Sequence, residues 1–160
     1  MIISEIDPSN YSRTITEFYL QDRTFLTKYH SEKDVSDGAC VKSCMGQLRD
    51  YDENDIAMHE VHVDGNKIGF FTLLQDRHLN AMCLYQFFIL PMFRTSANRN
   101  EMMGKVKELC GKVKLMASVY SQNEPVMRFY RKVGNLIHET KVKNLDVSVF
   151  ELKAGESLWR

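Results

Sequence analysis

The segment from residue 81 to 90 constrains the fold most, because it is apolar on both alternations of a strand. A half-buried strand alternates apolar and polar residues, whereas a strand that is apolar on both faces lies inside a sheet with cover on each side. Two further predicted strands, 56–63 and 68–74, precede it and are joined across Asp64-Gly65, a pair that two-residue hairpin turns favour. The three segments predict an antiparallel meander whose last strand is central.

The flanking segments alternate between strand and helix patterns. Before the meander we expect a strand over 1–6, a helix over 11–29, a weaker helix over 35–49 and a polar loop. After Pro91 we expect a helix with an apolar stripe through Met102, Val106 and Cys110, a strand over 114–120 and a helix over 123–133. A closing hairpin of 136–142 and 145–152 completes the order β-α-α-β-β-β-α-β-α-β-β. This order predicts an α/β fold with a mixed sheet, as one domain over residues 1–160.

Length and charge exclude several classes of protein. The chain has 160 residues with 21 basic and 21 acidic side chains, so its zero net charge does not favour nucleic acid or a membrane surface as a partner. No apolar stretch approaches a membrane span, and the first residues lack the pattern of a signal peptide. We therefore expect a cytoplasmic protein with reduced thiols. The cysteines concerned are Cys40, Cys44, Cys83 and Cys110.

The first segment that suggests chemistry runs from residue 87 to 100, where an apolar strand leads through a polar loop into a helix. The first turn of a helix has unpaired backbone N–H groups and a partial positive charge, which suit an anion such as a phosphate. Arg94 and Arg99 add positive charge there. The alternative is an ordinary connection with two solvated arginines.

The second segment runs from residue 115 to 135, where Asn123 follows a strand and Phe129-Tyr130 precede Gly134. A tyrosine hydroxyl in this position can give a proton to a leaving thiolate. The alternative is that Phe129 and Tyr130 are core aromatics.

A third group lies on the strand over 56–63. Glu60 and His62 are two residues apart, so they share one face of the strand and can relay a proton through water. The alternative is an exposed polar face. His59 and His62 are three apart and point to opposite faces, which argues against a shared metal, and we predict no metal site.

The first two segments together resemble the GNAT superfamily of acetyl-CoA-dependent N-acetyltransferases. Pro91-Met92-Phe93-Arg94 is similar to the entry of the family's cofactor loop, and Asn123, Phe129, Tyr130 and Gly134 are similar to its second motif. The order of the elements resembles the family fold over the whole chain. Two positions where the family has glycines in its cofactor loop hold Ala97 and Arg99 here.

The resemblance implies roles for particular residues. Backbone groups of Phe88 and Ile89 would bind the pantetheine arm, Asn123 would bond to it as well, and Tyr130 would protonate the CoA thiolate. Glu60 and His62 are the candidates for taking the proton from the amine, since Cys83 stands about where some members have a glutamate. The pyrophosphate would be held by the cofactor loop, that is by Arg94, Thr95, Ser96, Ala97, Asn98, Arg99 and Asn100.

The predicted function is transfer of the acetyl group of acetyl-CoA to a primary amine, by direct attack in a ternary complex. The acceptor would be an amine-bearing small molecule or protein, and the closing hairpin could pair across a homodimer. The alternative is a catalytically inactive binding or assembly module of the same fold, suggested by Ala97 and Arg99.

Overall fold

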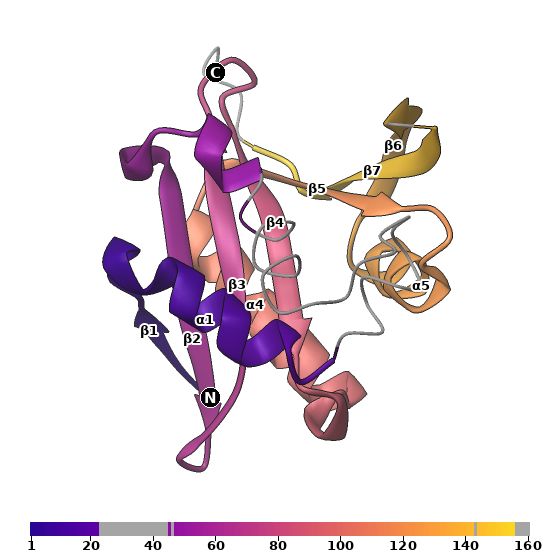
Figure 1. Cartoon of the computed structure of the whole chain (residues 1–160). Helices are drawn as coiled ribbons and strands as arrows, with labels where there is room; N and C mark the ends of the chain where they lie inside the picture. The colour runs from indigo at the N-terminus through magenta and orange to yellow at the C-terminus, as the bar shows by residue number, and fades with distance from the viewer. Residues whose placement is uncertain (23–44, 46, 143, 156–160) are drawn as a thin grey trace.

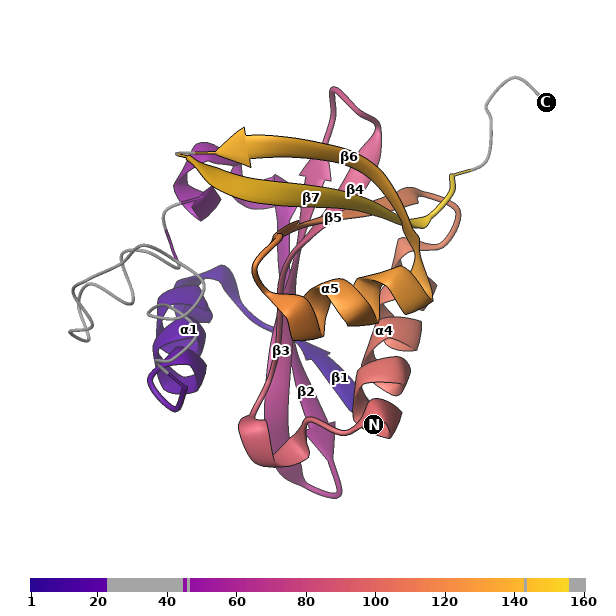
Figure 2. The ribbon, with the colours of Figure 1, turned by 90° about the vertical axis from the view of Figure 1, so that its right-hand side faces the viewer.

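A computed structural model describes residues 1–22, 45, 47–142 and 144–155. Its centre is a seven-stranded sheet of order β1-β2-β3-β4-β5-β7-β6. Helix α1 lies on one side of the sheet, whereas α4 and α5 lie on the other (Figure 2). The predicted mixed α/β layering is therefore confirmed.

Six of the seven strands pair antiparallel with a sequence neighbour, and β4 and β5 form the parallel pair that makes the sheet mixed. The crossover between β4 and β5 is α4, as expected for parallel neighbours. The strands are β1 (Ile2–Glu5), β2 (Ile56–Val63), β3 (Asn66–Asp76), β4 (Ala81–Ile89), β5 (Lys114–Tyr120), β6 (Asn135–Val142) and β7 (Leu145–Lys153).

Two of the predicted helices appear nearly as expected. Helix α4 spans Ser96–Cys110 and α5 spans Glu124–Val133. The described residues also form four 3-10 turns: η1 (Pro8–Asn10), η2 (Gln47–Asp50), η3 (Glu53–Asp55) and η4 (Pro91–Phe93).

The helix predicted over 11–29 is too long. Helix α1 spans Tyr11–Tyr19, and the next N–H groups turn back by three residues, Gln21 to the Phe18 carbonyl and Asp22 to the Tyr19 carbonyl. The apolar residues after position 22 suggested a longer helix, but they lie outside the described residues. Most of the helix predicted over 35–49 lies outside them too, and its described end is the 3-10 turn η2.

The sheet separates two hydrophobic clusters. On one face, Ile15 and Phe18 of α1 pack on Phe70 and Phe88, with Phe18 and Phe70 stacked at 5.2 Å between ring centroids. On the other face α4 and α5 cover a larger cluster that includes Met102, Val106, Leu84, Tyr130 and Phe150. Burial of these apolar faces holds the helices against β3 and β4, since the free energy gained scales with apolar area removed from water.

The predicted hairpin turn is confirmed by its backbone. Asp64 and Gly65 both have positive φ, 51° and 79°, which is what a type I′ turn requires. A second glycine, Gly69 on β3, is required by space: a Cβ there would lie 2.1 Å from the Phe88 carbonyl oxygen on β4. Close backbone approach therefore fixes β3 against β4 next to the candidate site.

Candidate active site

Strands β4 and β5 pair over part of their length and then diverge. The parallel register runs from Ala81↔Lys114 to Leu84↔Ala117 and stops there. Beyond it, β4 continues along β3 as far as Ile89, and residues 118–120 of β5 continue along β7. We call the stretch formed by 85–89 of β4 and 118–120 of β5 the β4–β5 divergence; β5 turns away from the lower half of β4 in Figure 1.

A β-bulge marks the start of the divergence. On β4, Gln86 pairs with Thr72 and Leu84 with Leu73, so the register skips Tyr85. The Thr72 hydroxyl donates to Gln86 Oε1 at 2.7 Å, and both side chains are buried. Such a bulge bends a strand and is a common device next to a functional site.

The divergence exposes backbone groups of alternate residues of β4. The Leu90 N–H donates to the Ile68 carbonyl on β3 at 2.8 Å, so Leu90 directs its backbone groups toward β3. Neighbouring residues of an antiparallel strand direct these groups to opposite edges. Phe88 therefore also faces β3, whereas Phe87 and Ile89 face the divergence. Of the pair expected to bind the pantetheine arm, Ile89 faces the divergence and Phe88 faces β3, because neighbouring residues of a flat strand direct their backbone groups to opposite edges.

Arg94 follows the end of β4 and is held there by two hydrogen bonds and a ring contact. Its Nε donates to the Ile89 carbonyl at 2.6 Å, and a terminal nitrogen contacts Asp22 Oδ2 at 2.8 Å. The guanidinium also lies 5.3 Å from the centre of the Phe88 ring. Arg94 thus joins the end of α1 to the end of β4, and these contacts compete with the phosphate-binding role predicted for it.

Helix α4 begins at the same end of the divergence. Thr95 is its N-cap: its Oγ1 accepts from the Asn98 N–H at 3.1 Å, and its carbonyl accepts from the Arg99 N–H at 3.0 Å. The Thr95 N–H itself donates to the Phe93 carbonyl. Of the predicted loop donors, Ser96 and Ala97 keep the N–H groups that the first turn of a helix leaves unsatisfied. Asn100 is exposed one turn further along.

Helix α5 carries the second motif. Asn123 is buried and caps it, since its Oδ1 accepts from the Val126 N–H at 3.4 Å. Tyr130 is 5% exposed and packs edge-on against Phe150 at 5.6 Å. Burial raises the pKa of Tyr130, so its hydroxyl keeps its proton at neutral pH. Gly134 must be glycine, because a Cβ there would lie 2.5 Å from the Glu151 carbonyl oxygen.

Glu60 and His62 do share one face of β2. His62 Nε2 and Glu60 Oε1 are 2.8 Å apart, and Glu60 Oε2 also pairs with Lys67 Nζ at 3.3 Å. Lys67 reaches Glu17 on α1 as well. Burial opposes the charge on Lys67, but the bonds to the two glutamates outweigh it and its pKa is raised.

The Glu60–His62 pair and Tyr130 are not brought together. Glu60 joins α1 through Lys67, so it lies on the α1 face of the sheet, whereas Tyr130 belongs to the cluster under α4 and α5. Along the register, Glu60 is opposite Phe70, which is opposite Phe88. Two strand spacings, about 10 Å, therefore separate Glu60 from β4.

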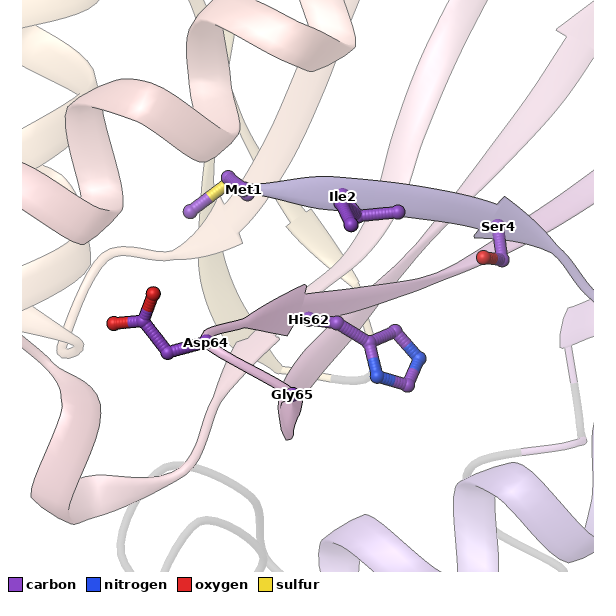
Figure 3. Close-up of a pocket in the computed structure, with 6 residues that line it drawn as sticks. All are labelled: Met1, Ile2, Ser4, His62, Asp64 and Gly65. Carbon is purple, nitrogen blue, oxygen red and sulfur yellow. The ribbon is translucent and has the colours of Figure 1, made fainter.

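A cleft of about 480 Å³ lies at the β1 edge of the sheet, beside the β2–β3 turn. Figure 3 shows that Ile2 and Ser4 of β1 line one side of it and His62, Asp64 and Gly65 the other. Among the predicted site residues, His62 borders this cleft. The cleft is separate from the β4–β5 divergence.

The described residues contain no group of three or more His, Cys, Asp or Glu side chains placed to hold a metal ion. His59 lies against Phe71 in the α4–α5 cluster and His62 on the opposite face, as the sequence predicted. Cys83 and Cys110 are free thiols, while the other two cysteines lie outside the described residues. Among the described helices, none is long and apolar enough to cross a membrane.

Comparison with known proteins identifies the fold. No family model matches the sequence, and no curated protein matches it either. Solved structures do match: an acetyltransferase from Thermus thermophilus aligns with a TM-score of 0.69 at 10% identity, over 94% of this chain and 96% of its own. The PaiA N-acetyltransferase from Thermoplasma acidophilum, solved with coenzyme A, aligns with a TM-score of 0.67 at 16% identity over 94% and 99%.

A third match is an aminoglycoside 6'-N-acetyltransferase complexed with coenzyme A, with a TM-score of 0.63 at 8% identity over 98% and 100%. The chain therefore has the fold of the GNAT acetyltransferases over nearly its whole length, as the sequence motifs predicted.

Sequence reasoning missed three features of the candidate site. Phe87 was missed because the pairing register decides which neighbouring strand its backbone groups face. The sequence pattern of one strand does not reveal this register. The bulge at Tyr85 needs two strands to define it. The contact between Asp22 and Arg94 joins residues 72 positions apart and has no local signal.

Proposed function

We propose that this chain transfers the acetyl group of acetyl-CoA to a primary amine, with the cofactor in the β4–β5 divergence. The observation that carries the proposal is the end of parallel pairing at Leu84↔Ala117, beside a bulge and above the first turn of α4. This arrangement offers strand-edge donors and acceptors for an extended amide chain and helix N–H groups for a phosphate. Two neighbours of the same fold were solved with coenzyme A.

The proposed placement uses specific groups. The pantetheine arm runs along β4 and bonds to the backbone of Phe87 and to the Ile89 N–H, since Arg94 already occupies the Ile89 carbonyl. Asn123 contributes its Nδ2 group, because its Oδ1 caps α5. The pyrophosphate lies over the N–H groups of Ser96 and Ala97, with Arg99 and Asn100 beside it.

In the proposed reaction the cationic amine first loses one proton to water, and its neutral nitrogen then attacks the thioester carbonyl carbon. A backbone N–H at the bulge stabilises the oxyanion that forms, and the carbon–sulfur bond then breaks. Tyr130 gives its proton to the departing thiolate, and the amine loses one further proton to water. We propose that Glu60 and His62 accept this proton. They lie on the α1 face about 10 Å from β4, so the proton reaches them through water.

We infer the class of acceptor amine from the charges on the α1 side of the sheet. There, Glu17 and Glu60 place two negative charges around Lys67. We propose a cationic amine. Neighbours of this fold include a spermidine N-acetyltransferase chimera and a ribosomal-protein α-N-acetyltransferase, so both a polyamine and a peptide N-terminus belong in the test.

The experiment measures CoA thiol release from acetyl-CoA with spermidine, an aminoglycoside and an N-terminal peptide. We expect turnover with at least one amine and a fall in kcat on the order of a hundredfold in Tyr130→Phe, with acetyl-CoA affinity unchanged. Tyr19→Phe is the matched control, a buried tyrosine of the other cluster that should keep its kcat.

Two outcomes would refute parts of the proposal. Equal kcat in Tyr130→Phe would remove the tyrosine from the proton transfer. Absence of both turnover and acetyl-CoA binding would favour the inactive binding module instead.

A further inference from the structure

The cleft at the β1 edge brings polar groups from two strands and a turn to one place (Figure 3). Ile2 of β1 is opposite His62 of β2 in the register. Ser4 is opposite Glu60 in the same way. Residues paired across two strands place their side chains on the same face, so the strand residues of the cleft lie on the α1 face of the sheet. Asp64 lines the cleft from the β2–β3 turn.

The polar groups that line the cleft accept hydrogen bonds. The ionised Asp64 carboxylate only accepts, and the Ser4 hydroxyl can accept as well as donate. His62 Nε2 lies 2.8 Å from Glu60 Oε1. Because a carboxylate only accepts, Nε2 carries the proton of this bond, and the neutral ring then offers Nδ1 as an acceptor. A ligand that satisfies these groups must therefore supply several N–H or O–H donors.

The cleft also carries an uncompensated negative charge. Neither Asp64 nor Ser4 has a hydrogen bond or an ion pair with another side chain among the described residues. Lys67 lies on the same hairpin, but Glu17 and Glu60 hold its ammonium group. An unpaired carboxylate among acceptor groups favours a ligand with a positive charge.

The apolar part of the cleft favours a cation with an aliphatic stem. Met1 and Ile2 line it, and the Ile2 side chain is 69% exposed. An aliphatic stem covers such a surface while its charged head reaches polar groups. A guanidinium group presents a planar fork of N–H donors that pairs with a carboxylate by two bonds, whereas an ammonium group acts as a point charge. The cleft has the volume of about sixteen water molecules, which is enough for an arginine side chain.

We propose that this cleft binds an alkylguanidinium group, the side chain of arginine. The guanidinium lies between the Asp64 carboxylate and His62 Nδ1, and the stem lies over Ile2. Free arginine and an arginine in a peptide share this chemistry. The cleft is separate from the β4–β5 divergence, and the proposal does not depend on the proposed function.

The test is a titration of the isotope-labelled chain with N-acetylargininamide, followed by NMR. We expect saturable shifts of the Ser4, Asp64 and Gly65 amide signals with a Kd of about 1 mM, in the range of a small ligand at an open site. N-acetylcitrullinamide has nearly the same shape without the charge, and it should bind about fivefold more weakly. N-acetyllysinamide keeps the charge without the planar fork and should also bind more weakly.

A charge-removing variant tests the carboxylate. Asp64→Asn keeps the turn, because Asn-Gly also favours type I′, and it should weaken binding of N-acetylargininamide about fivefold. The matched control is Asp146→Asn, which removes an exposed carboxylate on β7 and should leave the Kd unchanged. Circular dichroism checks that both variants keep their fold.

Two further probes distinguish the sources of the guanidinium group. Tighter binding of an arginine-containing tetrapeptide than of free arginine would assign it to a polypeptide, and the reverse order would assign it to the free amino acid. Absence of saturable shifts with N-acetylargininamide would overturn the proposal. So would equal affinity for the citrulline or lysine probe, or an Asp64→Asn variant that binds as tightly as wild type.

Discussion

Gly69→Ala tests the close contact that holds β3 against the candidate cofactor strand. An alanine Cβ would lie 2.1 Å from the Phe88 carbonyl oxygen, and the next atoms, also backbone, lie at 3.1 Å. Ordinary contact begins near 3.4 Å, so β4 must move by about 1.3 Å. Overpacking of a closed core costs about 1–3 kcal/mol, and a backbone neighbour cannot rotate away, so we expect about 3 kcal/mol of lost stability.

The matched control is Gly104→Ala on the exposed side of α4, where a Cβ meets nothing within 4 Å. The same added methyl group should there stabilise the chain by about 0.8 kcal/mol through helix propensity. For a chain of this size the two variants should shift Tm by about −6 to −12 °C and about +2 °C respectively.

Urea denaturation followed by circular dichroism measures both effects. A Gly69→Ala variant as stable as wild type would refute the reasoning, since it would mean that β3 and β4 are not in the close register described.

Two further predictions concern stability. Burial lowers the pKa of His59, whose Nδ1 has no hydrogen-bond partner among the described residues, so the unfolded chain binds more protons below about pH 6.5. The free energy of unfolding should therefore fall as the pH is lowered from 7 to 5, and it should fall less in His59→Leu than in wild type. An equal fall in both proteins would exclude His59 as the source of the pH dependence. Thr72→Val removes the buried hydroxyl that donates to Gln86 and should lower the free energy of unfolding, measured by urea denaturation, by about 1–2 kcal/mol. The exposed control Thr140→Val should change it by less than about 0.5 kcal/mol. Similar losses in the two variants would contradict this prediction.

The strands and the later helices could be predicted because each carries a local signal. The apolar run over 81–90, the Asp64-Gly65 turn and Gly134 mark boundaries that neighbouring residues determine. The end of α1 at Tyr19 was missed, because helical spacing of apolar residues continues in the sequence beyond the point where the chain turns. A sequence pattern therefore predicts the presence of a helix more reliably than its last residue.

The candidate site could be predicted by region but not by atom. The motifs located the end of β4, the start of α4 and the start of α5, and the structure places these together around the divergence. Which backbone groups face it depends on pairing with β3, and the engagement of Arg94 depends on Asp22 from a distant part of the chain. Both depend on contacts between distant parts of the chain, which a single sequence does not reveal.

Amide hydrogen exchange with and without CoA tests the central claim most directly, because it reports both binding and location. We predict slower exchange of the Phe87 and Ile89 amides on β4 and of the Ser96 and Ala97 amides at the start of α4, with β6 and β1 unchanged. Unchanged exchange in these segments at saturating CoA, or protection confined to the β1 edge, would contradict the account.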